Sequence, residues 1–124
     1  MITVRPSPGK GRGVFATQSI PAGRLIEEAP VIAIPNSEIG YLDCITLQDY
    51  YFLWGPDQQD AAVALGLCTL CNHSFDPNCQ YIRRPEVETI CFVALRDIAA
   101  GEELTINYNG NPDADRPLWF EVLP

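Results

Sequence analysis

The 124-residue chain has few basic residues, no long apolar run and a single histidine. Eight lysines and arginines stand against sixteen aspartates and glutamates, so the formal net charge is −8. This balance argues against a surface that binds nucleic-acid phosphates, and it suits either a basic partner or simple solubility. No stretch approaches the roughly 18 apolar residues that span a bilayer, and the first residues lack a signal-peptide pattern. We therefore expect no membrane contact and a cytoplasmic location, or a nuclear one in a eukaryote.

The five cysteines form an odd number, which does not suggest a disulfide framework. Cys68, Cys71, His73 and Cys79 fall between positions 68 and 79, without the two well-separated ligand pairs of common structural zinc sites. We therefore expect buried apolar thiols and no metal, and we keep a small zinc or redox protein as an alternative.

Eleven prolines and nine glycines divide the chain into short segments, and a hydrophobic fraction of 47% is ordinary for one globular domain, 1–124. Short β-rich runs predict a mainly β fold with several small antiparallel sheets. They lie at residues 2–5, 13–16, 25–28, 31–34, 89–94 and 104–107. Residues 36–71 are less regular and are expected to form an insert with a short helix. Residues 60–66 are the best helical candidate, because Asp60 and Gly66 suit its two ends and alanines lie between them.

The pattern Ala-x-x-x-Ile-x-Ala-Gly-x-x-(Ile/Leu) occurs twice, at residues 16–26 and 94–104. Each copy is typical of a strand, an apolar anchor, a tight glycine turn and a second strand. Two copies are too few for a solenoid, so they predict two similar β-units packed in one body.

Three polar motifs carry the chemical information: KGRGVFA at 10–16, NHSFDPNC at 72–79 and GEELTINY at 101–108. Taken singly, each is explained by turn chemistry, because glycines suit hairpins and Asn or Ser side chains cap the local backbone. In this order and at this separation, they resemble the signature motifs of SET-domain protein lysine methyltransferases. The resemblance covers nearly the whole chain.

The resemblance implies a β-clip-like SET fold whose C-terminal segment, about 109–124, is threaded as a pseudoknot under the 72–79 loop. It also implies methyl transfer from S-adenosylmethionine to a lysine amine of a basic protein or peptide. The alternative is a SET-like binding module that has lost turnover. The substrate, the number of methyl groups transferred and the oligomeric state stay open.

The resemblance places six residues around the cofactor: Lys10, Gly11, Arg12, Asn72, His73 and Trp119. In similar proteins, main-chain atoms of the glycine turn contact the methionine carboxylate and amino group. The Asn-His pair faces the cofactor, and a C-terminal aromatic residue packs near the adenine. Plain core packing explains Trp119 nearly as well, and a lone histidine is more often structural than catalytic.

Two tyrosines are the candidate catalytic residues. Tyr108 resembles the active-site tyrosine of the family, and Tyr81 resembles the aromatic residue that limits how many methyl groups fit. The reaction requires a neutral lysine amine, and deprotonating a free lysine near pH 8 costs roughly 3 kcal/mol. An apolar channel and a nearby sulfonium both lower the pKa of that amine, so orientation and exclusion of water suffice. The alternative for Tyr108 is a buried tyrosine whose hydroxyl is satisfied.

The chain departs from many histone-directed members of the family in two places. Residues 25–31 contain no tyrosine, and residues 109–124 contain no cysteine. The sequence therefore resembles a minimal SET domain without a zinc-binding segment after the catalytic tyrosine, and its protein substrate stays undetermined.

Overall fold

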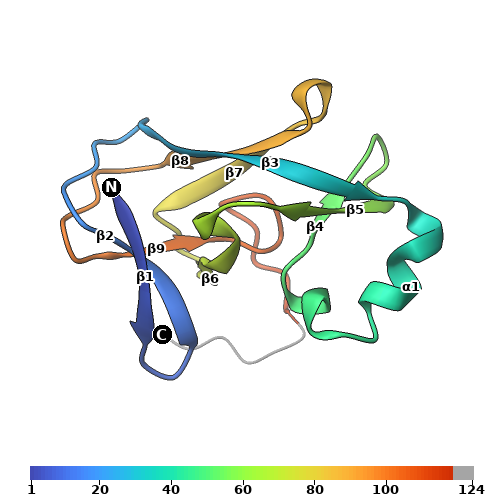
Figure 1. Cartoon of the computed structure of the whole chain (residues 1–124). Helices are drawn as coiled ribbons and strands as arrows, with labels where there is room; N and C mark the ends of the chain where they lie inside the picture. The colour runs from blue at the N-terminus through green and yellow to red at the C-terminus, as the bar shows by residue number, and fades with distance from the viewer. Residues whose placement is uncertain (119–124) are drawn as a thin grey trace.

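Two β-sheets form the body of the protein, as the computed structural model shows for residues 1–118 (Figure 1). The four-stranded sheet has the order β1-β2-β9-β6, and the five-stranded sheet has the order β4-β5-β3-β8-β7. The strands are β1 (Ile2–Ser7), β2 (Gly11–Ala16), β3 (Leu25–Ile34), β4 (Phe52–Trp54), β5 (Asp60–Ala64), β6 (Asn72–His73), β7 (Cys79–Arg84), β8 (Thr89–Ala94) and β9 (Glu103–Ile106). This confirms the predicted mainly β class.

Helical turns are short and lie mostly in the insert. They are α1 (Ile39–Leu42) and the 3-10 helices η1 (Asn36–Glu38), η2 (Thr46–Asp49), η3 (Leu67–Leu70) and η4 (Pro85–Val87). No helix within residues 1–118 is long and apolar enough to cross a bilayer.

Strand β3 is one ten-residue strand where the sequence predicted two separate runs. Pro30 lies inside it without breaking it, because the strand changes partner there. β3 pairs with β8 as far as Pro30 opposite Thr89, and with β5 from Val31 opposite Ala64 onwards. Proline lacks an N–H group, so the point where one ladder ends and another begins is where a strand tolerates it. β3 thus ties the insert to the rest of the sheet.

The predicted helix at residues 60–66 is wrong, because residues 60–64 form strand β5. Ala61, Ala62 and Ala64 are buried, and β5 pairs with β3 on one side and β4 on the other. Alanine favours helices when local propensity decides, but burial between two strands overrides that preference. Small side chains suit this crowded position.

The repeated Ala-Ile-Gly pattern forms two units that face each other. Ile20 and Ile98, its two anchors, exchange backbone hydrogen bonds of 2.8 Å in both directions and are each 1% exposed. The two turns use glycines with left-handed backbone, Gly23 at φ 83° and Gly101 at φ 88°. The prediction of two similar β-units in one body is confirmed.

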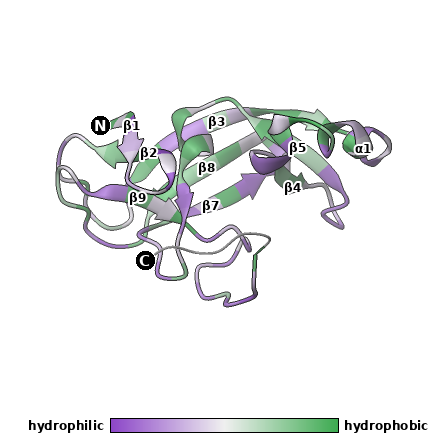
Figure 2. Ribbon diagram, turned by 90° about the horizontal axis from the view of Figure 1, so that it is seen from below, coloured by the Kyte–Doolittle hydropathy of each residue, from purple (hydrophilic) through white to green (hydrophobic). Residues whose placement is uncertain are grey.

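The hydrophobic core lies between the two sheets, and alternate residues along the strands point into it. In β8 every second side chain, Ile90, Phe92 and Ala94, is buried, as a half-buried strand requires. β7 alternates in the same way, which turns Tyr81 to the inside. Figure 2 shows β3, β8 and β7 side by side, with β1, β2 and β9 at one end and β4, β5 and α1 at the other.

The 72–79 loop wraps over β9. Strand β6 pairs with β9 in parallel, and the buried Asn78 side chain accepts a hydrogen bond from Thr105 N (2.8 Å) and donates one to Glu103 O (2.8 Å). The second and third motifs are therefore adjacent in space. The threading of residues 109–124 stays a prediction, because residues 119–124 lie outside the described part of the chain.

Candidate functional site

Tyr108 lies directly beyond β9, where two cavities share a wall. The larger cavity, about 540 Å³, is lined by Asp43, Gln48, Asp49, Tyr50, Tyr51, Phe52, Leu53, Thr69, Tyr81, Arg83, Ile106, Tyr108 and Asn109. The smaller, about 440 Å³, is lined by Lys10, Gly11, Arg12, Asp49, Tyr50, Leu70, Asn72 and Tyr108. Asp49, Tyr50 and Tyr108 line both. The structure thus separates the glycine turn and Asn72 from Tyr81, and it places Tyr108 between them.

The Tyr108 hydroxyl has a fixed orientation. It donates a 2.7 Å hydrogen bond to the carbonyl oxygen of Cys71. Burial, and to a smaller extent the neighbouring Cys71, raises the pKa of Tyr108 above its usual value. The hydroxyl therefore stays protonated at neutral pH, so it can orient a reacting group but cannot serve as a base.

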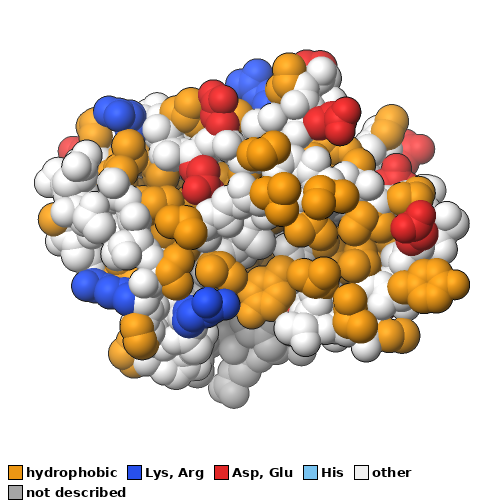
Figure 3. Space-filling model, in the orientation of Figure 1, with side chains coloured by type: hydrophobic (Ala, Val, Ile, Leu, Met, Phe, Trp, Pro, Cys, Tyr) orange, Lys and Arg blue, Asp and Glu red, His pale blue; other side chains and the backbone are white. Residues whose placement is uncertain are grey.

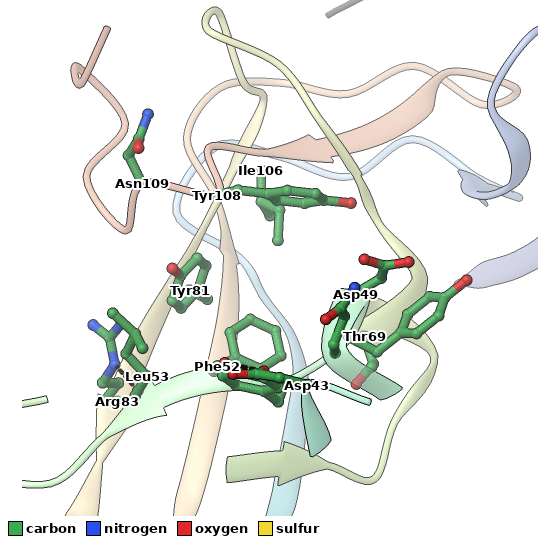
Figure 4. A pocket seen from close by; sticks show the side chains of 13 residues that line it. Asp43, Asp49, Phe52, Leu53, Thr69, Tyr81, Arg83, Ile106, Tyr108 and Asn109 are labelled. Atoms are coloured by element: carbon green, nitrogen blue, oxygen red, sulfur yellow. Dashed lines mark hydrogen bonds between the residues drawn. The ribbon is translucent and has the colours of Figure 1, made fainter. Parts of the chain in front are cut away.

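The larger cavity is an aromatic channel between the two edge strands β4 and β7. Figure 4 shows Tyr108 across the cavity from Phe52, with Tyr81 on one side and Asp49 on the other. Phe52 and Tyr81 meet edge to face with ring centroids 4.9 Å apart. Arg83 donates from Nε to Leu53 O (2.7 Å) and thereby links the two edges. Burial raises the pKa of Tyr81, although the positive charge of Arg83 opposes the shift.

The smaller cavity is bounded by the glycine turn and by Asn72. Gly11 has a left-handed backbone, φ 74°, and no atom would lie within 4 Å of an added Cβ. The Asn72 Nδ2 group donates to Arg12 O (3.0 Å) and to Glu103 Oε2 (2.7 Å). These contacts bring the first, second and third motifs together at one place.

His73 lines neither cavity. Its ring is buried against Phe75 and Tyr108, and its Nδ1 atom accepts a 3.0 Å hydrogen bond from the Tyr108 backbone N–H. Burial, with a smaller contribution from the charge of Lys10, lowers the pKa of His73. A neutral ring is what this acceptor role requires. The contact of His73 with a cofactor stays a prediction, and Trp119 lies outside the described residues.

Sequence reasoning missed several residues of the site. Asp49 and Tyr50 come from the irregular insert, where the aromatic-rich composition was the only signal. Glu103 stands inside the third motif but had no partner that local sequence could reveal, because Asn72 is 31 positions away.

The cysteines are reduced and mostly buried, and Cys68, Cys71 and Cys79 are at most 1% exposed. Burial raises the pKa of Cys79 to about 12, and a hydrogen bond with Cys71 together with burial raises the pKa of Cys68. Such thiols stay protonated at neutral pH in the absence of a metal ion. Among residues 1–118, no group of three or more His, Cys, Asp or Glu side chains is arranged to hold a metal ion. Independence from metal stays a prediction.

The SET-domain family model matches residues 11–109, which include nearly all of this site. The chain belongs to the SET-domain family. The match begins at Gly11 in the glycine turn and ends one residue after Tyr108, so it includes all of the three motifs except Lys10.

Relatives of this SET domain are lysine methyltransferases. The Schizosaccharomyces pombe "Histone-lysine N-methyltransferase, H3 lysine-37 specific" is 35% identical over 121 residues, which cover 97% of this chain and 77% of that protein. The Danio rerio "N-lysine methyltransferase KMT5A-A" is 33% identical over 122 residues, covering 85% of this chain but only 34% of that protein. The crystal structure of a candidate histone methyltransferase of Plasmodium falciparum has a TM-score of 0.69 at 27% identity, covering 90% of this chain and 99% of that one.

Proposed function

We propose that this SET domain transfers a methyl group from S-adenosylmethionine to the side-chain amine of a lysine in a protein substrate. The observation that carries the proposal is the position of Tyr108 at the shared wall of two cavities, one polar and one aromatic. The lysine methyltransferase relatives support the same reaction class.

The smaller cavity fits the amino-acid end of the methyl donor. Its volume of about 440 Å³ is typical of small-molecule sites. The Lys10 cation suits a carboxylate, the backbone of Gly11 and Arg12 can approach a ligand closely, and Asn72 offers a polar group. The donor supplies an electrophilic methyl group carried on a sulfonium. The Tyr108 hydroxyl and the Cys71 carbonyl place two oxygen atoms beside the junction of the cavities, where they favour positive charge.

The larger cavity fits a lysine side chain. The rings of Phe52, Tyr81 and Tyr108 give it an apolar wall, and an amine that lies against this wall is favoured in the neutral form that must attack the methyl group. Asp43 and Asp49 are exposed at the same cavity, where they attract a cationic lysine as it approaches. The residues of the chain therefore supply orientation, desolvation and steering, and no general base is needed.

The protein substrate is expected to be basic, in keeping with the net charge of −8. Apolar side chains gather over β4, β5 and the insert, beside the larger cavity (Figure 3). Exposed apolar residues of this region are Tyr41, Ile45, Leu47, Tyr50 and Leu53. We propose a histone or another lysine-rich protein as the substrate. The relatives named for histone substrates give no support to the expected cytoplasmic location, and we propose the nucleus of a eukaryotic cell instead.

Methyl transfer is tested with labelled cofactor and purified histones or a mixed protein lysate. Label is expected on lysine residues of one or a few proteins. Binding of cofactor without any transfer would instead support the alternative of an inactive binding module.

The chain is expected to bind S-adenosylmethionine without a metal ion. Residues 109–124 contain no cysteine, and no group of three or more His, Cys, Asp or Glu side chains within residues 1–118 is arranged to hold a metal ion. Calorimetry in excess chelator should give the same affinity and melting temperature as calorimetry without it. Loss of fold or of binding on chelation would favour the zinc-protein alternative.

Tyr81→Phe is expected to raise the methylation state of the product more than it lowers the rate. The ring still packs on Phe52, and only the hydroxyl is removed, which frees space for an amine that already carries a methyl group. Mass spectrometry of the product measures the distribution of methyl states. Tyr51→Phe is the matched control, because its hydroxyl donates to Asp43 (3.1 Å) on the exposed side of the same cavity. An unchanged distribution in Tyr81→Phe would remove Tyr81 from this role.

A further inference from the structure

Glu103 joins three strands beneath the smaller cavity without lining it. Its Oε1 atom accepts a hydrogen bond from Ser7 Oγ in β1 (2.9 Å), and its Oε2 atom accepts one from Asn72 Nδ2 in β6 (2.7 Å). The carboxylate also lies against Gly13 of β2, where a Cβ would collide with Oε2 and lie 3.0 Å from Asn72 Nδ2. Asn72 is therefore the lining residue of the smaller cavity to which Glu103 is hydrogen-bonded.

The carboxylate determines which way the Asn72 amide faces. Both groups at the amide nitrogen, Arg12 O and Glu103 Oε2, are acceptors without a hydrogen, so only the NH₂ group can face them. Both amide hydrogens are thereby used. The Oδ1 atom turns away from them, and no residue within 1–118 donates a hydrogen bond to it. Asn72 thus offers an acceptor to whatever enters the smaller cavity.

We propose that Glu103 is a positioning residue: it holds the Asn72 amide in this orientation and so makes the smaller cavity selective for a ligand that carries an ammonium group. This inference rests on the proposed function, and it names the part of the ligand that Asn72 recognises. An ammonium group donates to Asn72 Oδ1, while the Lys10 cation suits the carboxylate of the same amino acid. The part of the ligand that Asn72 and Lys10 recognise is therefore an α-amino acid.

Glu103→Gln separates this role from general support of the fold. A glutamine is neutral, so the hydrogen bond that Asn72 Nδ2 donates to residue 103 is no longer charge-assisted, and Arg12 O is the acceptor that remains unchanged. Calorimetry on the full chain compares two probes, S-adenosylhomocysteine and 5′-methylthioadenosine, which lacks the amino-acid part. We expect affinity for the first to fall about ten- to hundredfold and affinity for the second to stay within about threefold.

Ser7→Ala is the matched control. It removes the other hydrogen bond to Glu103 and leaves the carboxylate that Asn72 needs, so we expect it to lower stability without changing the ratio of the two affinities. Nuclear magnetic resonance of the wild-type protein adds a test that does not depend on folding of a variant. Both Asn72 side-chain amide hydrogens should be protected from exchange with solvent.

The possible results distinguish a failure of the role of Glu103 from a failure of the proposed function. Equal weakening of both probes, or no change in either, would overturn the role of Glu103, as would rapid exchange of the Asn72 amide hydrogens. A wild-type protein that binds neither probe would instead overturn the proposed function, and this inference with it.

Discussion

Tyr108→Phe is expected to lower turnover about a hundredfold or more, with cofactor affinity and fold close to those of the wild type. The phenylalanine ring keeps the contact with His73, and the backbone N–H still donates to His73 Nδ1. The substitution removes the 2.7 Å hydrogen bond to Cys71 O. A buried hydrogen bond contributes about 1 kcal/mol to stability, so we expect the melting temperature to fall by no more than about 5 °C.

We expect the turnover rate to fall far more than the stability, because Tyr108 lines both cavities at the place where they meet. Small misplacements of a reacting centre can reduce the rate about a hundredfold. Turnover per folded molecule, measured beside the wild type on one substrate, is the decisive quantity. Tyr41→Phe, at a tyrosine that is 78% exposed, is the control and should behave as wild type. A Tyr108→Phe variant that is less stable but turns over normally would show that Tyr108 is a structural tyrosine.

Gly13→Ala should weaken S-adenosylmethionine binding about tenfold or more and leave the protein folded. The new Cβ collides with the Glu103 carboxylate, which is the far end of a flexible side chain and can move aside. Once the carboxylate moves, the Asn72 side chain loses one of its two hydrogen-bond acceptors. Its amide group is then no longer held in one orientation. The loss of a charge-assisted hydrogen bond explains an effect of this size.

Gly23→Ala is the control for this substitution. Gly23 has φ +83° and no atom within 4 Å of an added Cβ, so alanine there introduces only backbone strain of about 1–2 kcal/mol. Calorimetry and thermal melting of both variants should show weaker binding in Gly13→Ala and mainly lower stability in Gly23→Ala. Equal cofactor affinity in Gly13→Ala and the wild type would mean that the contact of Gly13 with Glu103 and Asn72 has no part in binding.

The sequence predicted the features that depend on local chemistry. Turn glycines, alternating apolar residues and the repeated Ala-Ile-Gly pattern indicated a mainly β protein with two similar units, and the structure pairs Ile20 with Ile98 as that pattern suggested. The order of the three motifs was sufficient to recognise the family, because each motif is short and keeps its own residue types. The helix predicted at residues 60–66 was wrong because tertiary packing decided the structure of this segment. Burial between β3 and β4 outweighed the helix propensity of the alanines.

By itself, the sequence predicted which residues form the candidate site: a glycine turn, an asparagine and two tyrosines. Only the tertiary structure decided that Tyr108 separates two cavities, and that Asp49 from the insert lines both. It also decided that Glu103 holds Asn72, which is 31 residues away. The contact between Glu103 and Asn72 joins strands that are distant in sequence, and it forms only when β6 and β9 pair. Local residue preferences carry no information about such pairs, so the folded sheet alone reveals which carboxylate orients which amide.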